Sequence, residues 1–138
     1  YFRYSTMNAG KSLELISTHH NYIELGHNPV ALMPKVFGNS IKSRVGIEIP
    51  SLTFDETYSF RKDDLDILKD CDCILIDEAQ SLTKEQVVEL HQIAKFNDIP
   101  VICYGLRTNF QGKPFEGSIM LLALADELQE LMKRNKQK

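Results

Sequence analysis

Residues 5–12 read Ser-Thr-Met-Asn-Ala-Gly-Lys-Ser and stand between the strand-like stretch Tyr1–Tyr4 and a run with helical spacing over Lys11–Leu25. A turn that ends in Gly-Lys-Ser at the start of a helix is typical of a phosphate-binding loop, although Ser5 stands where that pattern begins with glycine. The backbone N–H groups of such a loop and the positive end of the helix dipole face phosphate oxygens. This segment therefore predicts an α/β fold with a site for a phosphorylated ligand.

The last residues of this segment have distinct expected roles. Lys11 is expected to reach the outer phosphates, and the Ser12 hydroxyl is expected to ligate magnesium. Gly10 lets the backbone approach a phosphate without a side chain between them. A chance Gly-Lys-Ser at the start of a helix is the alternative, and only a second feature of the sequence can decide against it.

That second feature is an apolar run, Cys73–Ile76, which ends in Asp77 and Glu78. A phosphate-binding loop requires a carboxylate at the end of a buried strand to hold its magnesium ion, and Asp77 fits this role. Glu78 is expected near the γ-phosphate, where it could act as a general base on the attacking group. Because that group could be water or a substrate hydroxyl, the residues alone leave hydrolysis and transfer open.

Predicted strands and helices alternate along the chain. Helical spacing indicates helices that begin near Lys11 and after the capping residue Thr83, and short apolar runs indicate strands. This alternation predicts the α/β class, as a P-loop NTPase-like parallel β-sheet flanked by helices. The predicted strands are Tyr1–Tyr4, Val30–Met33, Leu52–Phe54, Cys73–Ile76 and Val101–Tyr104.

Four other segments have less regular patterns. Pro34–Pro50 is predicted to be a long loop, and Asp63–Asp70 is predicted to be a short helix. Ser118–Ala125 is predicted to be a helix, and Glu127–Met132 either extends it or forms a last strand.

Composition and charge narrow the class of protein. The 138 residues are 43% hydrophobic and 25% charged with a net charge of −3, which fits one globular domain without the basic stripe that a nucleic-acid partner requires. The longest strongly apolar run, Ile119–Ala125, is far shorter than the roughly 20 residues of a membrane span. We expect Cys71, Cys73 and Cys103 to be reduced and structural, which favours a cytoplasmic protein. The histidines lack metal-ligand spacing.

Four stretches, taken in order, resemble the bacterial branch of the type II thymidine kinases. They are Tyr4–Ser12, Ser43–Gly46, Asp77–Gln80 and Ile99–Phe115. Within the last, Gly-Leu-Arg-Thr-Asn-Phe is far more specific than a phosphate-binding loop alone, and bacterial members also carry serine at the first position of that loop. The resemblance implies a P-loop nucleotide-binding kinase domain over residues 1–133 and a polar tail over residues 134–138.

The resemblance also implies a reaction and the residues that serve it. Glu78 would take the proton from the 5′-hydroxyl of thymidine, which attacks the γ-phosphate of magnesium-bound ATP and gives dTMP and ADP for deoxynucleotide salvage. Magnesium would bind at Ser12 and Asp77, the thymine pocket would include Met7, Leu106 and Phe110, and a homotetramer is the usual assembly. The implied ATP-binding residues are Ser5, Thr6, Met7, Asn8, Ala9, Gly10, Lys11, Ser12, Asp77, Glu78, Ala79 and Gln80.

Three features depart from the family pattern. Members continue into a small lobe that binds structural Zn²⁺ and wraps over thymidine, so we expect zinc only downstream of this chain. Lys35–Ser40 stands where relatives carry an Asp-x-Arg motif near the magnesium, and Ser81 stands where they carry an aromatic residue. We expect the chain to be part of a longer working enzyme, and a reduced form of the enzyme is the alternative.

Two other functions stay open at this point. A P-loop ATPase or nucleotide switch would use Glu78 to activate water, and ADP release that ignores thymidine would favour it. A truncated, non-catalytic nucleotide-binding domain would use the predicted helix around Leu121–Leu124 for packing between subunits. Nucleotide binding without turnover would favour this second alternative.

Overall fold

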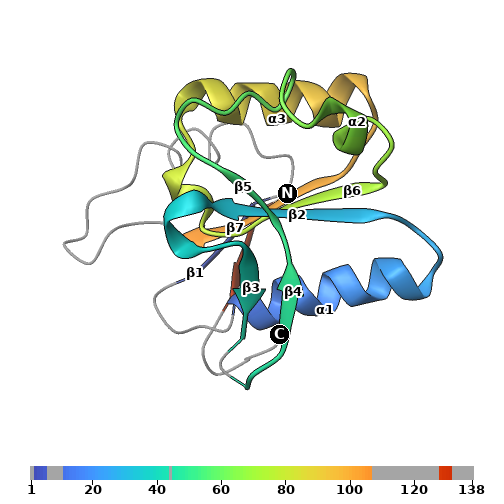
Figure 1. Ribbon diagram of the computed structural model, residues 1–138, viewed down its shortest axis with the longest axis vertical. Helices are drawn as coiled ribbons and strands as arrows, with labels where there is room; N and C mark the ends of the chain where they lie inside the picture. Colours follow the sequence, from blue (N-terminus) through green and yellow to red (C-terminus); the bar gives the residue numbers. More distant parts are fainter. Residues whose placement is uncertain (1, 6–10, 44, 107–127, 132–138) are drawn as a thin grey trace.

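A six-stranded parallel β-sheet with helices on both faces forms the centre of the protein, as the computed structural model shows over residues 2–5, 11–43, 45–106 and 128–131 (Figure 1). The strand order is β5-β2-β6-β7-β1-β8, and a separate hairpin is formed by β3 and β4. The predicted α/β class with a parallel sheet flanked by helices is confirmed. In chain order the elements are β1 (Phe2–Ser5), α1 (Lys11–Glu24), β2 (Pro29–Pro34), η1 (Lys35–Phe37), β3 (Ser40–Lys42), β4 (Glu48–Pro50), β5 (Leu52–Phe54), α2 (Leu65–Leu68), β6 (Cys73–Ile76), η2 (Ala79–Ser81), α3 (Lys84–Phe96), β7 (Val101–Leu106) and β8 (Leu128–Leu131). The elements η1 and η2 are single turns of 3-10 helix.

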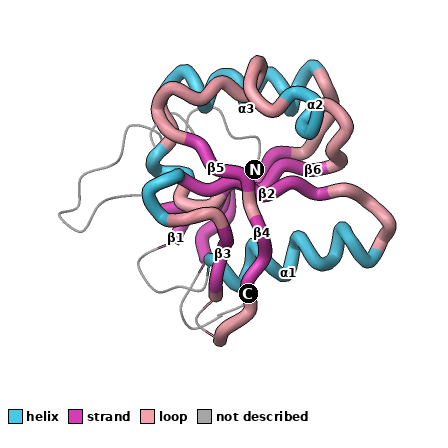
Figure 2. Tube along the Cα trace, viewed as in Figure 1, coloured by secondary structure: helices cyan, strands magenta, loops and turns pink. Residues whose placement is uncertain are grey.

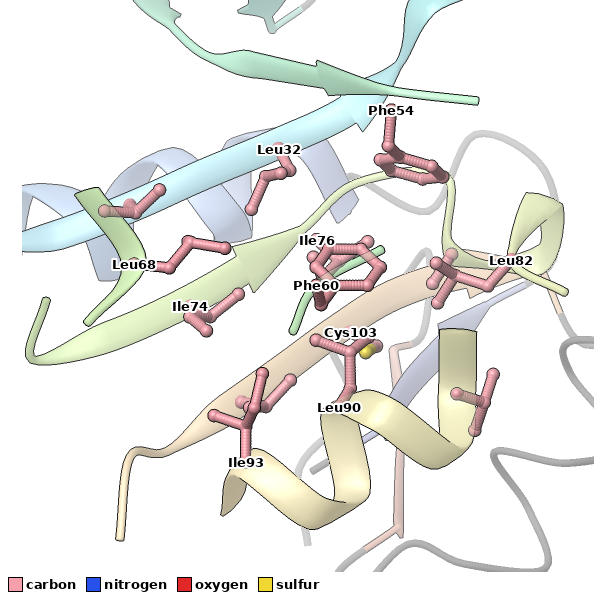
Figure 3. Packing of buried hydrophobic residues seen from close by; sticks show 14 of the residues in the cluster. Leu32, Phe54, Phe60, Leu68, Ile74, Ile76, Leu82, Leu90, Ile93 and Cys103 are labelled. Carbon is pink, nitrogen blue, oxygen red and sulfur yellow. The ribbon is translucent and has the colours of Figure 1, made fainter. Parts of the chain in front are cut away.

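The two faces of the sheet carry two separate hydrophobic clusters, because successive strand residues point to opposite sides. In β6, Ile74 and Ile76 belong to the cluster under α2 and α3, whereas Cys73 and Leu75 belong to the cluster over α1. Figure 3 shows the first cluster, in which Leu90 of α3 lies with the strand residues. Figure 2 shows the corresponding layers, with α3 and α1 on opposite sides of the strands. Every residue of β6 is buried, as expected for the middle of a parallel sheet.

Local sequence sets the ends of the two long helices. α1 ends before Gly26, whose φ of 82° suits glycine, and the N–H groups of Gly26 and His27 bond to the carbonyls of Ile23 and Tyr22. α3 begins after Thr83, which accepts from the backbone N–H of Gln86 while the Gln86 side chain accepts from the backbone N–H of Thr83. Both boundaries agree with the predictions made from Gly26 and Thr83.

Two predicted segments differ from the structure. The predicted loop Pro34–Pro50 instead contains the turn η1 and the antiparallel hairpin of β3 and β4. The strands of the hairpin are short, and Ile41 and Ile49 pack against the α1 side of the core, so tertiary burial decides their structure. The helix predicted over Asp63–Asp70 is also shorter, because α2 spans only Leu65–Leu68.

The open alternative near the C-terminal end is decided in favour of a strand. β8 runs parallel to β1, with Phe2 opposite Leu128 and Ser5 opposite Leu131. The predicted helix Ser118–Ala125 and the tail over residues 134–138 lie outside the described residues. Cys71, Cys73 and Cys103 are all free and buried.

Candidate nucleotide-binding site

The predicted site lies at the carboxyl edge of the sheet, where β1, β6 and β7 end. β1 and β7 are paired side by side, with Ser5 opposite Leu106 at their last residues. α1 begins at Lys11, six positions beyond Ser5, the last described residue before the gap at 6–10. Because ligands of parallel α/β sheets bind outside the carboxyl ends of the strands, a ligand is expected at this edge.

Ser12 and Asp77, the two predicted magnesium ligands, lie together at this edge. The Ser12 hydroxyl donates to Oδ2 of Asp77 over 3.4 Å. Asp77 is only 4% exposed, its Oδ1 accepts from the backbone N–H of Glu78 at 2.9 Å, and its own N–H donates to the carbonyl of Leu32 at 2.8 Å. The hydrogen bond to β2 therefore fixes the Asp77 backbone, and the backbone N–H of Glu78 orients the Asp77 carboxylate.

Glu78 has a backbone conformation that few residues with a side chain adopt. Its φ is 53° and its ψ is 46°, in the left-handed region, at the start of the turn η2. Such a conformation costs of the order of 1–3 kcal/mol and concentrates at functional sites. The carbonyl of Glu78 accepts from the N–H of Ser81 at 3.0 Å, and its Oε1 accepts from Nε2 of Gln80 at 2.6 Å. The turn thereby holds the half-buried carboxylate in one orientation.

Gly105 in β7 packs directly against this turn. A Cβ atom built on Gly105 would lie 2.7 Å from Oε1 of Gln80, 3.0 Å from the backbone nitrogen of Gln80 and 3.1 Å from the backbone nitrogen of Ala79. No side chain fits in this space without displacing backbone atoms of the turn. Gly105 comes directly after the predicted strand Val101–Tyr104, whereas β7 extends to Leu106, so the sequence pattern did not indicate that this glycine lies inside a strand at a close backbone approach.

The structure brings together only part of the predicted site. Ser12, Asp77, Glu78 and Gln80 lie near the carboxyl edge, whereas the side chain of Ala79 is fully buried in the core and can offer a ligand only its backbone. Ser5, Lys11 and Leu106 are described along the backbone alone. Thr6, Met7, Asn8, Ala9, Gly10 and Phe110 lie outside the described residues.

Neither departure noted within the sequence is buried. Lys35–Ser40, which stands in place of the Asp-x-Arg motif, contains η1 and the first residue of β3, and none of its residues is buried. Ser81, in place of an aromatic residue, ends η2 and is exposed. None of these side chains is part of either hydrophobic cluster.

Neither a clustered metal site nor a membrane-spanning helix is found in the part of the chain that the structure describes. No group of three or more His, Cys, Asp or Glu side chains there could hold a metal ion. None of the helices described is both long and apolar enough to cross a bilayer. A magnesium ion bound with a nucleotide needs fewer protein ligands, because phosphate oxygens and water complete its coordination.

Comparison with known proteins gives one consistent family. A family model described as thymidine kinase matches residues 1–134. A thymidine kinase of Rhodopirellula baltica is 47% identical over 138 residues, which cover 95% of this chain and 65% of that protein. A thymidine kinase of Chromobacterium violaceum is 44% identical over 136 residues, which cover 95% of this chain and 72% of that protein. The chain thus spans about two thirds of the length of these relatives.

Among solved structures, a chain from work titled "Structural Basis for DNA Unwinding at Forked dsDNA by two coordinating Pif1 helicases" overlaps 94% of this chain and 38% of its own length. The TM-score is 0.49 and the sequence identity is 16%. The assignment of the fold rests on the strand order and not on this likeness.

Proposed function

This chain belongs to the thymidine kinase family, and we propose that it forms the nucleotide-binding part of an enzyme that transfers the γ-phosphate of ATP to the 5′-hydroxyl of thymidine. The products would be dTMP and ADP, for use in deoxynucleotide salvage. The observation that carries the proposal is the placement of Ser12, Asp77 and Glu78 at one edge of the sheet, directly beside the start of α1.

Glu78 is the proposed general base. It follows the buried Asp77 directly, so the turn that fixes one carboxylate also fixes the other. A base that takes the proton of the 5′-hydroxyl makes that oxygen a better nucleophile as the phosphoryl group transfers, and such catalysis contributes about 10²- to 10⁴-fold. Lys11 and the amides of residues 5–12 are proposed to hold the phosphates, together with the backbone at Ala79 and Gln80.

Ser12 and Asp77 are the proposed magnesium ligands. Their oxygen atoms are the ligand type that magnesium prefers, and the 3.4 Å contact between Ser12 Oγ and Asp77 Oδ2 supports a shared partner. When bound, the ion would neutralise charge on the ATP phosphates. Met7, Leu106 and Phe110 are proposed to line the thymine pocket, on the strength of their match to the family pattern alone.

A homotetramer is the proposed assembly. An open groove of about 530 Å³ runs between α1 and the β3–β4 hairpin, and apolar side chains including Leu13, Ile23 and Ile47 line it. Leu13 is 41% exposed, Ile23 54% and Ile47 49%, which is unusual for large apolar residues that lie together. Burial of this surface between subunits would remove these residues from water.

We propose a cytoplasmic location and a zinc-binding lobe beyond this chain. Three buried, free cysteines support a reducing compartment. The relatives extend beyond the matched region, and the structural Zn²⁺ of the family is assigned to that additional part. The kinase domain is assigned to residues 1–133 and the polar tail to residues 134–138.

The proposed function is tested by ADP release from Mg-ATP, with and without thymidine, for this chain and for the full-length gene product. Release that depends on thymidine, together with dTMP formation, would establish the kinase. Equal release in the absence of thymidine would instead establish an ATPase and remove the proposed roles of Met7, Leu106 and Phe110.

A further inference from the structure

We propose that Gln80 is a positioning residue for Glu78, and that Gly105 keeps the Gln80 side chain in the place where it can do this. The proposal rests on the proposed function, because it takes Glu78 as the general base. Gln80 would thus orient the catalytic carboxylate through its side chain, which is a role different from contact with ATP. Gly105 would leave the space for that side chain.

The Gln80 side chain is hydrogen-bonded to the Glu78 carboxylate. Nε2 of Gln80 donates to Oε1 of Glu78 at 2.6 Å, a short hydrogen bond to a carboxylate. Glu78 is half-buried, whereas Gln80 is only 9% exposed, so the donor is the more firmly packed of the two. The buried amide thus orients a carboxylate that faces the carboxyl edge of the sheet.

The backbone conformation of Glu78 brings Gln80 into reach of the Glu78 side chain. Its left-handed conformation turns the chain sharply, so that Gln80, two residues later, lies back beside the Glu78 side chain. A residue with a side chain keeps such a conformation only where its surroundings determine it strongly. The hydrogen bonds from Ser81 N–H to the Glu78 carbonyl and from Gln80 to the Glu78 carboxylate both serve this purpose.

Gly105 leaves the space that the Gln80 side chain occupies. A Cβ atom there would lie 2.7 Å from Gln80 Oε1, the other end of the amide that bonds to Glu78. It would also lie 3.0 Å from the backbone nitrogen of Gln80, so the turn as well as the side chain would have to move. The absence of a side chain at Gly105 therefore sets the position of the amide, and β7 fixes Gly105 through its pairing with β1 opposite Tyr4.

The first test compares Gln80→Ala, Glu78→Gln and the double variant in the full-length gene product. We expect Gln80→Ala to lower kcat by about 10- to 100-fold, because a misplaced catalytic group costs about this much, while the KM values for ATP and thymidine stay within about twofold. If Gln80 acts through Glu78, the double variant is no slower than Glu78→Gln alone. Further loss in the double variant, or a large rise in the KM for ATP, would overturn the positioning role.

The second test replaces Gly105 with alanine. Gly105→Ala is expected to reproduce the loss of kcat, whereas the matched control Gly26→Ala is expected to keep kcat. At Gly26, with φ of 82° and no atom near the added Cβ, alanine introduces backbone strain far from the site. Equal kcat for Gly105→Ala and the wild type would remove Gly105 from the proposal.

The wild-type reaction separates this proposal from the proposed function. If the wild type releases ADP without thymidine, the kinase assignment fails, but the same variants are then compared on hydrolysis, where Glu78 would orient water. Unchanged hydrolysis in Gln80→Ala would overturn the positioning role in that case as well. No ADP release at all by the wild type would overturn both proposals.

Discussion

Oγ of Ser12 lies 3.4 Å from Oδ2 of Asp77, although 65 positions separate the two residues in the chain. One residue belongs to the first turn of α1 and the other follows β6, so the contact depends on the packing of a helix end beside a strand end. This juxtaposition is the structural basis for the proposed metal and phosphate chemistry.

Asp77→Asn is expected to abolish most turnover, because a neutral amide is a poor ligand for a hard divalent cation. We expect at least a 100-fold loss of kcat and a higher magnesium concentration for half-maximal rate, measured by ADP release across a magnesium titration. Asp66→Asn, at an exposed position of α2, is the matched control and should retain wild-type dependence on magnesium. An unchanged magnesium titration for Asp77→Asn would exclude it as a ligand.

Glu78→Gln is expected to lower kcat by about 10²- to 10⁴-fold with ATP binding preserved, because glutamine keeps the shape but cannot take a proton. Steady-state assays give kcat, and calorimetry gives the affinity for Mg-ATP. Glu85→Gln, on an exposed position of α3, serves as control. Wild-type kcat in Glu78→Gln would remove Glu78 from the role of base.

Gln86→Ala is expected to lower the free energy of unfolding by about 2–3 kcal/mol. The buried Gln86 amide donates to the carbonyls of Asp55 at 2.7 Å and Tyr58 at 3.0 Å, and its Oε1 accepts from the Thr83 N–H at 3.0 Å. Loss of the side chain leaves these backbone groups without that partner. Urea titrations measure the change.

The control for that substitution is Gln92→Ala on the same helix, which is only partly buried. Its effect should be within about 0.5 kcal/mol. Equal destabilisation by the two variants would show that helix propensity, and not the contacts between Gln86 and the loop, determines the result.

Alkaline pH is expected to destabilise the fold through its buried thiols. Burial raises the pKa of the Cys103 thiol from 9.0 to about 12 and that of Cys73 from 9.0 to about 11. Below pH 9 both states keep these protons, so the full stability is present. Above it the unfolded chain ionises first, and stability is lost as the pH rises toward the folded-state values.

For Cys103 this linkage amounts to roughly 1–2 kcal/mol of unfolding free energy between pH 9 and pH 10.5. Urea titrations at the two pH values measure it, and Cys103→Ala should show a correspondingly smaller difference between them. The same pH dependence in the wild type and in Cys103→Ala would contradict the assignment.

Ile23→Glu is expected to dissociate the proposed tetramer, since it places a charge on the apolar groove beside α1. Sedimentation velocity on the full-length product would then give a smaller species than the wild type. Phe96→Glu is the control, because Phe96 is 80% exposed and lies at the end of α3 on the opposite face of the sheet (Figure 1). A tetramer that survives Ile23→Glu would place the interface elsewhere.

Much of the fold could be predicted, because strong local signals and the global arrangement agree. The continuous apolar strand Cys73–Ile76, the cap at Thr83 and the glycine at residue 26 each gave a boundary that the structure reproduces. The hairpin of β3 and β4 could not be predicted, since its strands are short and owe their structure to the burial of Ile41 and Ile49 against α1.

The sequence by itself determined the order of the strands and helices apart from the β3–β4 hairpin and β8, and it placed a phosphate-binding pattern before α1, because periodicity, caps and turns act over neighbouring residues. It also pointed to Ser12, Asp77 and Glu78 by their places at the ends of predicted elements. Only the tertiary structure decided that Ser12 meets Asp77, that Gln80 holds Glu78 and that Gly105 makes room for Gln80. The Ser12–Asp77 and Gly105–Gln80 contacts join separate elements, and their geometry depends on sheet pairing and helix packing, which sequence spacing does not specify. The Gln80–Glu78 contact is local, but it depends on the left-handed backbone at Glu78.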